Sequence, residues 1–326
     1  MASKSIGIEI GSDTLKMTVV QGSKVLLMAA ERLPDHLIQD GRVLSPETMS
    51  SFIKQMRKNH HIPGGQCAMV LPPQFVIGLQ LSLPVMKEEE LLLNLPFEFH
   101  DYVGKGDDVY NYDYIIRDVH DNIMDIYAVA VRHDLVEEYW NIFKKAGLDL
   151  KVAIPQEMAW LNLIGEAKDV PEKLAIVDIG HNSTRINIFD KDNFVMGKGV
   201  EFAGQLFDET IAAEMKMDPH AARSRKEGNI DDILNAEFMQ QPFGAVAIEV
   251  MRTVSFYNYS LSPEQEPLKD VYFCGGSANI EILRTAITNA TELNLHPIDQ
   301  LLNTKDDDAS MALRCALCVG AAIQLQ

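Results

Sequence analysis

The sequence predicts an α/β fold built from two similar lobes that face each other across a cleft. Residues 5–30 contain three short aliphatic runs separated by polar turns, which is the pattern of three consecutive strands. Residues 174–199 repeat this pattern about half a chain later. In each unit an acidic residue lies near the end of the first strand, and a turn of glycine and hydroxyl residues follows it. A unit that occurs twice in 326 residues indicates a duplicated core.

The strands and turns of the two units correspond one to one. In the first unit we expect strands at Ser5–Ile10, Leu15–Val20 and Lys24–Ala30, with turns at 11–14 and 21–23. In the second unit we expect strands at Leu174–Ile179, Arg185–Phe189 and Phe194–Gly199, with turns at 180–184 and 190–193. This correspondence places Glu9 and Asp178 at equivalent positions of the two lobes.

The first turn of each unit has the composition of a phosphate-binding loop. Glycine lets the backbone approach an anion closely, and N–H groups together with Ser and Thr hydroxyls can hold phosphate oxygens. Lys16 can add a positive charge, and the carboxylates of Glu9 and Asp178 can hold Mg²⁺ directly or through water. Either turn alone would fit a plain hairpin loop equally well, so the prediction depends on the two copies together.

A third glycine-containing turn follows a later strand. The apolar run Asp270–Cys274 ends in Gly275, Gly276 and Ser277, and Ile280–Thr288 carries apolar residues at helical spacing. A strand, a glycine turn and a helix N-terminus together can bind the phosphate or sugar edge of a nucleotide. Such a turn is common, so by itself it is a weak indication.

The order of these features resembles that of the actin-like ATPases. That family carries a first phosphate loop, a connecting helix, a second phosphate loop, an adenosine loop and a closing helix. The matching segments are Ile8–Lys16, Pro155–Leu163, Val177–Thr184, Phe273–Ser277 and Ala316–Ala322. Within this fold the chain is most similar to the PilM family of type IV pilus assembly proteins.

The narrower resemblance depends on the stretch between the two phosphate loops. Leu83 and Pro84 lead into an acidic helix, and the segments Phe97–Tyr102 and Tyr112–Tyr114 continue the PilM pattern. A strand at Met124–Val131 and a helix at Asp134–Ala146 follow. This stretch resembles the small subdomain, called 1C, that PilM shares with the division protein FtsA.

The resemblance implies a two-lobed actin-like fold, that is, duplicated ribonuclease-H-like domains with an insert of the FtsA and PilM type. The implied subdomains are 1A at residues 1–80 with 151–173 and 309–326, 1C at 81–150, 2A at 174–204 with 268–308, and 2B at 205–267.

The resemblance also implies a site for ATP and Mg²⁺. It assigns nucleotide binding to Gly11, Ser12, Asp13, Thr14, Lys16, Asp178, Gly180, Asn182, Ser183, Thr184, Gly204, Glu249, Arg252, Gly275, Gly276 and Ser277. It assigns the metal to Glu9 and Asp178. Glu249 and Arg252 would line the adenosine pocket, but their spacing fits a surface ion pair on one helix equally well.

Three departures from the family pattern bear on catalysis. Glu9 stands where the family usually has the shorter Asp, and Ala203 with Gly204 retains one glycine of a usual pair. Asp13 places an acid in the first phosphate loop, where it would repel ATP unless it points outward, as we expect. The sequence therefore predicts ATP binding with at most slow hydrolysis.

By resemblance, the expected function is that of an ATP-binding cytoplasmic protein of type IV pilus assembly or of a related secretion or DNA-uptake machine. Members of the family bind the cytoplasmic N-terminal tail of the membrane protein PilN beside the insert. The expected partners are therefore a PilN-like tail and other components of the inner-membrane platform. We expect the protein to be recruited to the inner face of the membrane by these contacts.

Three alternatives remain open on the sequence alone. One is an FtsA-like cytoskeletal ATPase that forms filaments, and another is a small-molecule kinase on the same fold. A third is an adaptor that binds no nucleotide, which Glu9 and Asp13 would favour.

The composition excludes other classes of partner. With 29 basic and 47 acidic residues the formal charge is −18, which argues against nucleic acid and against electrostatic docking on anionic lipid. No apolar run approaches the roughly 20 residues of a membrane span, so we expect no direct insertion. The run Asp306–Asp308 lacks the spacing of a calcium loop and is expected to solvate a loop before the last helix.

Overall fold

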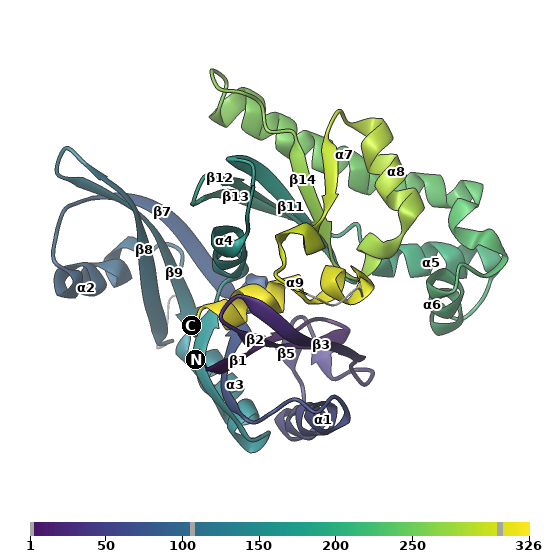
Figure 1. Ribbon diagram of the computed structural model, residues 1–326, viewed down its shortest axis with the longest axis horizontal. Coiled ribbons are helices and arrows are strands. Elements are labelled where there is room, and N and C mark those ends of the chain that lie inside the picture. Colours follow the sequence, from purple (N-terminus) through teal and green to yellow (C-terminus); the bar gives the residue numbers. More distant parts are fainter. Residues whose placement is uncertain (1–2, 105–107, 305–308) are drawn as a thin grey trace.

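A computed structural model describes residues 3–104, 108–304 and 309–326, so Asp306–Asp308 lie outside the described residues. Lobe 1 is built on a five-stranded sheet in the order β10-β6-β1-β2-β3 (Figure 1). Its strands are β1 (Lys4–Ile10), β2 (Thr14–Gln21), β3 (Lys24–Arg32), β6 (Gly65–Val70) and β10 (Leu148–Ile154). A short hairpin of β4 (Ile38–Gln39) and β5 (Arg42–Val43) lies outside this sheet.

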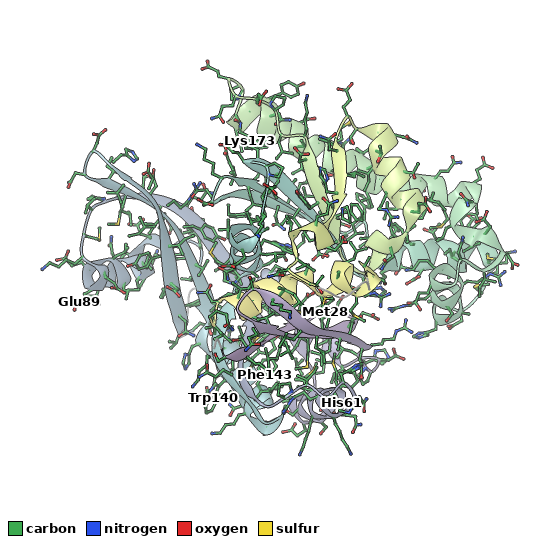
Figure 2. All side chains as sticks on the ribbon, viewed as in Figure 1. Met28, His61, Glu89, Trp140, Phe143 and Lys173 are labelled. Atoms are coloured by element: carbon green, nitrogen blue, oxygen red, sulfur yellow. The ribbon has the colours of Figure 1, made fainter. Side chains whose placement is uncertain are left out.

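Helices cover both faces of the lobe 1 sheet. Buried residues of α1 (Pro46–Asn59) and α3 (His133–Lys145) share one core with the sheet. The other face contacts α4 (Gln156–Glu166) and α9 (Ala309–Ile323), whose core also includes residues of lobe 2 such as Ile176 and Tyr272. On α3, Phe143 is buried whereas Trp140 is 42% exposed, as the amphipathic spacing predicts (Figure 2).

Lobe 2 repeats the architecture of lobe 1. Its sheet has the order β13-β12-β11-β14-β15. The strands are β11 (Lys173–Ile179), β12 (Thr184–Asp190), β13 (Asn193–Val200), β14 (Asp270–Cys274) and β15 (Asn294–Pro297). The helices of this lobe are α5 (Gly204–Met215), α6 (Pro219–Glu227), α7 (Gln240–Phe256) and α8 (Glu281–Ala290).

The register of the strands confirms the predicted duplication. In each lobe three antiparallel strands are followed by two parallel ones, and the first strand lies at the centre. Glu9 is paired with Lys16 across β1 and β2, and Asp178 is paired with Arg185 across β11 and β12. The two acids therefore occupy equivalent places, and each lies opposite a basic residue on the neighbouring strand.

The insert forms a separate three-stranded sheet at the side of lobe 1 (Figure 1). Its order is β7-β9-β8, with β7 (Val76–Pro84), β8 (Tyr110–His120) and β9 (Ile123–Arg132), and α2 (Glu88–Glu98) packs on one face. Leu91 and Leu95 are buried in this core, whereas Leu93 and Phe97 are 74% and 77% exposed. Among the described residues no helix is both long enough and apolar enough to span a bilayer.

Candidate functional site

The cleft between the lobes holds a cavity of about 1010 Å³. Both predicted phosphate loops and the third glycine turn line it. The predicted site residues that line this cavity are Glu9, Gly11, Ser12, Asp13, Thr14, Lys16, Asp178, Gly180, Asn182, Ser183, Gly276 and Ser277. Residues that lie up to 268 positions apart in the chain are thus brought together at one site, because the two sheets present equivalent strand ends to the cleft.

The two phosphate loops have the same local geometry. In the first, the amide of Gly11 donates to the carbonyl of Thr14 over 3.0 Å. In the second, the amide of Gly180 donates to the carbonyl of Ser183, also over 3.0 Å. Each loop therefore closes on itself between the same two strands of its lobe. The hydroxyl of Thr184, by contrast, donates to the carbonyl of Phe202 over 2.7 Å and lies in the interior rather than in the cavity.

Lys16 lies beside the two acids at the base of the cleft. Its Nζ is 2.6 Å from Oε1 of Glu9. Burial raises the pKa of Glu9 and of Asp178, and the charge of Lys16 opposes that rise. Burial lowers the pKa of Lys16, but attraction from Glu9 and Asp178 outweighs it and the pKa is raised. The three groups are therefore electrostatically coupled, as buried charges of opposite sign must be.

These carboxylates fit a magnesium ion that keeps most of its water. Mg²⁺ is usually held by one or two carboxylates, several waters and substrate phosphates rather than by a complete protein cage. The described residues contain no cluster of three or more acidic, His or Cys side chains suited to a metal. Glu9 and Asp178 could thus supply two oxygens and would need phosphate to complete the site.

Glycine is required where the third turn meets the second phosphate loop. Gly275 has φ of +96°, and a Cβ there would lie 2.5 Å from Oδ1 of Asp178. At Gly204, the first residue of α5, a Cβ would lie 2.8 Å from the hydroxyl of Ser277. Gly204 and Gly275 therefore do not line the cavity, but they allow three segments to pack closely around it.

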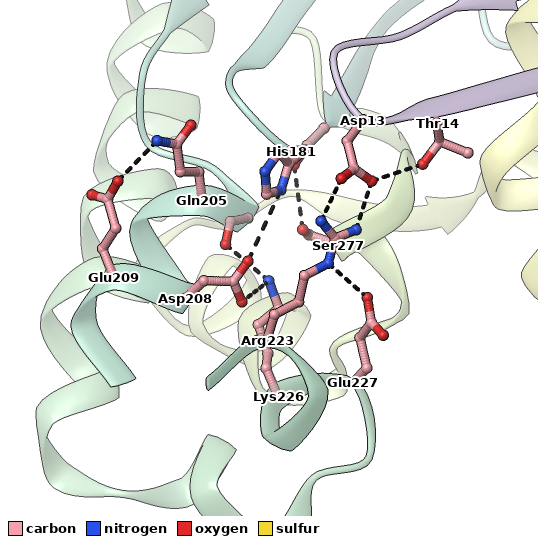
Figure 3. A network of polar contacts seen from close by, with 12 residues as sticks. Asp13, Thr14, His181, Gln205, Asp208, Glu209, Arg223, Lys226, Glu227 and Ser277 are labelled. Carbon is pink, nitrogen blue, oxygen red and sulfur yellow. Dashed lines mark hydrogen bonds and ion pairs between the residues drawn. The ribbon is translucent and has the colours of Figure 1, made fainter. Parts of the chain in front are cut away.

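Asp13 does not point outward, contrary to the expectation from sequence. Its carboxylate points across the cleft to Arg223 on α6, with Oδ2 2.6 Å from Nη2 and Oδ1 bonded to Nη1 (Figure 3). Nε of Arg32, in lobe 1, lies 3.6 Å from Oδ1 of the same carboxylate. Burial alone would raise the pKa of Asp13, but the hydrogen bonds and charge of Arg223 lower it to about 2. The acid is thus tolerated in the loop because the opposite lobe neutralises it.

Lys226, one turn further along α6, is already paired within lobe 2. Lys226 Nζ lies 2.6 Å from Asp208 and donates to the carbonyl of Gly204 over 2.8 Å (Figure 3). His181 of the second phosphate loop lies 4.0 Å from Asp208, and burial lowers its pKa. His181 is therefore part of this network.

Glu249 and Arg252 do not line the cavity. They form the i,i+3 ion pair, with Nη1 of Arg252 2.8 Å from Oε1 of Glu249, and Lys198 of β13 lies 2.6 Å from Oε2. The hydrogen bond from Lys198 lowers the pKa of Glu249. Because these groups satisfy one another away from the cleft, we leave both out of the candidate site.

Several residues of the cavity were not singled out by the sequence. They include Gln156, Arg185, Arg223, Lys226, Asn279 and Arg314. One signal was available for α6, because Arg223, Arg225 and Lys226 form a basic cluster in a strongly acidic chain. The others belong to strands and helices whose direction toward the cleft is set only by tertiary packing.

A second, smaller cavity of about 270 Å³ lies between β7 of the insert, the start of α4 and strands β12 and β13 of lobe 2. Arg185 and Gln156 line both this cavity and the cleft. Near them, Tyr127 of the insert donates a hydrogen bond to the buried Glu157. Burial lowers the pKa of Arg185, while Glu157 and Asp178 act in the opposite direction. Arg185 thus lies between the acid of the cleft and the acid that contacts the insert.

This architecture is that of a two-lobed actin-like protein with a 1C-type insert, which is the predicted fold class. A chain of a PilM–PilN type IV pilus biogenesis complex superposes with a TM-score of 0.80 at 20% identity, covering 99% of both chains. The ethanolamine utilization protein EutJ of Carboxydothermus hydrogenoformans gives 0.63 at 14% identity, covering 99% of this chain and 90% of that one. Component A of the (R)-2-hydroxyglutaryl-CoA dehydratase of Acidaminococcus fermentans gives 0.50 at 10% identity, covering 99% and 97%. These similarities confirm the fold.

The particular family follows from the sequence. The model of the type IV pilus assembly protein PilM family matches residues 7–313, so the chain belongs to that family. This membership confirms the expected role in type IV pilus assembly. A comparison with curated proteins gave no significant match.

Proposed function

We propose that the protein binds ATP with Mg²⁺ in the cleft and that the nucleotide controls docking of a PilN-like tail. The observation that carries this proposal is the pair of equivalent phosphate loops that face one cavity from opposite lobes. A ligand that bridges both loops stabilises the arrangement in which they are close. Nucleotide binding would therefore shift the population of the lobes toward a closed state.

Each loop has a defined part in holding the phosphates. The backbone and hydroxyls of Gly11, Ser12 and Thr14 would hold one side, and Gly180, Asn182 and Ser183 the other. When bound, Mg²⁺ would neutralise phosphate charge beside Glu9 and Asp178. Lys16 pairs with Glu9, attracts Asp178 electrostatically, and would add its own charge to the phosphate site. Hydrolysis, if it occurs, is proposed to be slow, because Glu9 stands where the family usually has the shorter Asp.

The insert is proposed to receive the tail. One structural relative that covers nearly the whole chain is a chain of a PilM–PilN complex, which supports a PilN-like partner here. An extended tail can gain main-chain hydrogen bonds at an exposed strand edge and place side chains in neighbouring pockets. Recruitment to the inner face of the membrane, and contacts with other platform components, would follow from this docking.

Arg185 and Gln156 offer a physical connection between nucleotide and insert. Both line the cleft and the smaller cavity beside β7. A change in charge near Asp178 would alter the electrostatic attraction on Arg185. Because Glu157 also attracts Arg185 and accepts a hydrogen bond from Tyr127, this change would reach the insert. Arg185 and Gln156 are thus shared by the nucleotide site and the tail site. The two binding events are coupled if nucleotide and tail both change the preferred arrangement of these residues.

Titration of a fluorescent peptide tests this proposal. The peptide carries the N-terminal cytoplasmic segment of the PilN-like protein of the same organism, and its anisotropy is followed with and without ATP and Mg²⁺. We expect its Kd to differ by at least about fivefold between the two conditions. Arg185→Lys keeps the charge but loses the planar guanidinium group, and it should reduce the difference in Kd between the two conditions. Equal affinities in wild type, or binding of a scrambled peptide, would contradict the proposal.

A further inference from the structure

Asp13 and Arg223 form an ion pair that joins the two lobes across the mouth of the cleft. Both line the cavity, and their side chains are only 15% and 16% exposed. The contact is bidentate, with each Nη of Arg223 bonded to a different carboxylate oxygen (Figure 3). Among the ion pairs between described residues, it is the pair that links lobe 1 with lobe 2. Its geometry is that of the strongest class of charged hydrogen bond.

Arg223 retains donors that a phosphate could use. A guanidinium has five N–H groups. Contacts with described residues engage three of them, because Nε donates to Glu227 over 2.9 Å and each Nη donates once to Asp13. The neighbouring Lys226 is not equivalent, since moving it would leave Asp208, a carboxylate only 4% exposed, without its cation. Arg223 is therefore the α6 cation that can be redirected into the cavity.

Asp13 has a second cation available on its own lobe. Arg32 Nε lies 3.6 Å from Oδ1, and the hydroxyl of Thr14 donates to Oδ2 over 3.0 Å. If Arg223 turned away, Asp13 would keep one positive neighbour and one hydrogen bond. A nucleotide phosphate beside the loop repels this carboxylate and competes with it for the same guanidinium, which both anions can bind in bidentate fashion.

We propose that Asp13 and Arg223 are an exchange pair: the guanidinium passes from Asp13 to a nucleotide phosphate, and Asp13 then pairs with Arg32. Asp13 thereby lowers nucleotide affinity, and Arg223 raises it. The inference rests on the proposed nucleotide site and adds to it a pair of residues that sets how tightly the cleft holds phosphate. When the ligand binds, the Asp13–Arg223 ion pair between the lobes would therefore be replaced by a contact of Arg223 with the bound phosphate.

A double-mutant cycle tests the exchange. The Kd of ATP with Mg²⁺ is measured by calorimetry for wild type, Asp13→Asn, Arg223→Gln and the double variant, with thermal unfolding to verify that each is folded. We expect Asp13→Asn to bind about tenfold more tightly and Arg223→Gln about tenfold more weakly, on the scale of one charged hydrogen-bonded contact. Asp13→Asn should tighten binding much less in the Arg223→Gln background than in wild type, because without Arg223 only the relief of direct repulsion remains.

Controls separate this inference from the proposed function. Arg225 lies on the same helix but pairs with Asp231, so Arg225→Gln should bind like wild type. Arg223→Lys, which keeps the charge and loses the fork, should fall between wild type and Arg223→Gln. If wild type binds ATP and Asp13→Asn binds equally or more weakly, the exchange is overturned while the nucleotide site stands. If folded wild type binds no nucleotide, both are overturned.

Discussion

Replacing Lys16 with methionine is expected to lower the free energy of unfolding by about 3 kcal/mol at neutral pH. Lys16 and Glu9 are 13% and 15% exposed and lie 2.6 Å apart, with Asp178 acting on the same ammonium group. Methionine has a similar length but no charge. The variant would therefore leave two largely buried carboxylates without their cation, and ATP affinity should fall as well.

The loss of stability in Lys16→Met should depend on pH in a defined direction. Burial already raises the pKa of Glu9 and Asp178, and removal of Lys16 raises it further. A carboxyl whose pKa is higher in the folded protein contributes fully to stability below its unfolded pKa, and this contribution is lost as pH rises from the unfolded to the folded pKa. Urea unfolding at about pH 5 and about pH 8 should therefore show the larger loss at the higher pH.

Two comparisons make this prediction specific. The double variant Glu9→Gln with Lys16→Met removes one of the stranded carboxylates, so it should recover part of the stability. Lys198→Met removes a cation of the same type from the Glu249 pair, where Lys198 is 41% exposed, and should cost no more than about 1 kcal/mol. A loss that is independent of pH and unchanged by Glu9→Gln would contradict the electrostatic explanation.

Replacing Gly320 with alanine is expected to destabilise the protein by about 3 kcal/mol. Gly320 lies where α9 crosses α4, and a Cβ there would be 1.9 Å from the carbonyl oxygen of Ala159. The obstacle is backbone, so it cannot rotate away as a side chain could. Since α4 and α9 pack together in the core that contains residues of both lobes, the whole crossing would have to open.

Gly244 provides the matched control for Gly320. It lies inside α7, and a Cβ there would meet nothing within 4 Å. Gly244→Ala should therefore be neutral or stabilise by up to about 1 kcal/mol, through the higher helix propensity of alanine. Urea unfolding of both variants measures the difference. If both changed stability equally, the close approach of α9 and α4 would not be what requires glycine at position 320.

Local pattern was sufficient to predict the duplicated core. The acid and the glycine turn recur at the same step of both units, and strand period and turn chemistry are local properties. The strand register then placed Glu9 and Asp178 at equivalent sites. Resemblance supplied the order of the loops, and the cavity lining agrees with most of the residues that it named.

Contacts between distant segments could not be predicted in the same way. Asp13 and Arg223 are 210 residues apart, so nothing near Asp13 indicates its partner. Glu249 and Arg252 had two interpretations on sequence; in the structure they form the ion pair and do not line the cavity, and the further partner Lys198 lies on the distant strand β13. Arg185 has an ordinary place in β12, and its contact with two cavities depends on how the insert packs against lobe 2.

Calorimetric titration of ATP into the folded protein, first with Mg²⁺ and then with a chelator, tests the central claim most directly. We predict one nucleotide per chain, weaker binding without the metal, and loss of affinity in Lys16→Met under conditions where that variant remains folded. Arg252→Gln, which lies outside the cavity, should bind like wild type. Absence of binding by folded wild type, or loss of affinity in Arg252→Gln alone, would contradict the nucleotide site described above.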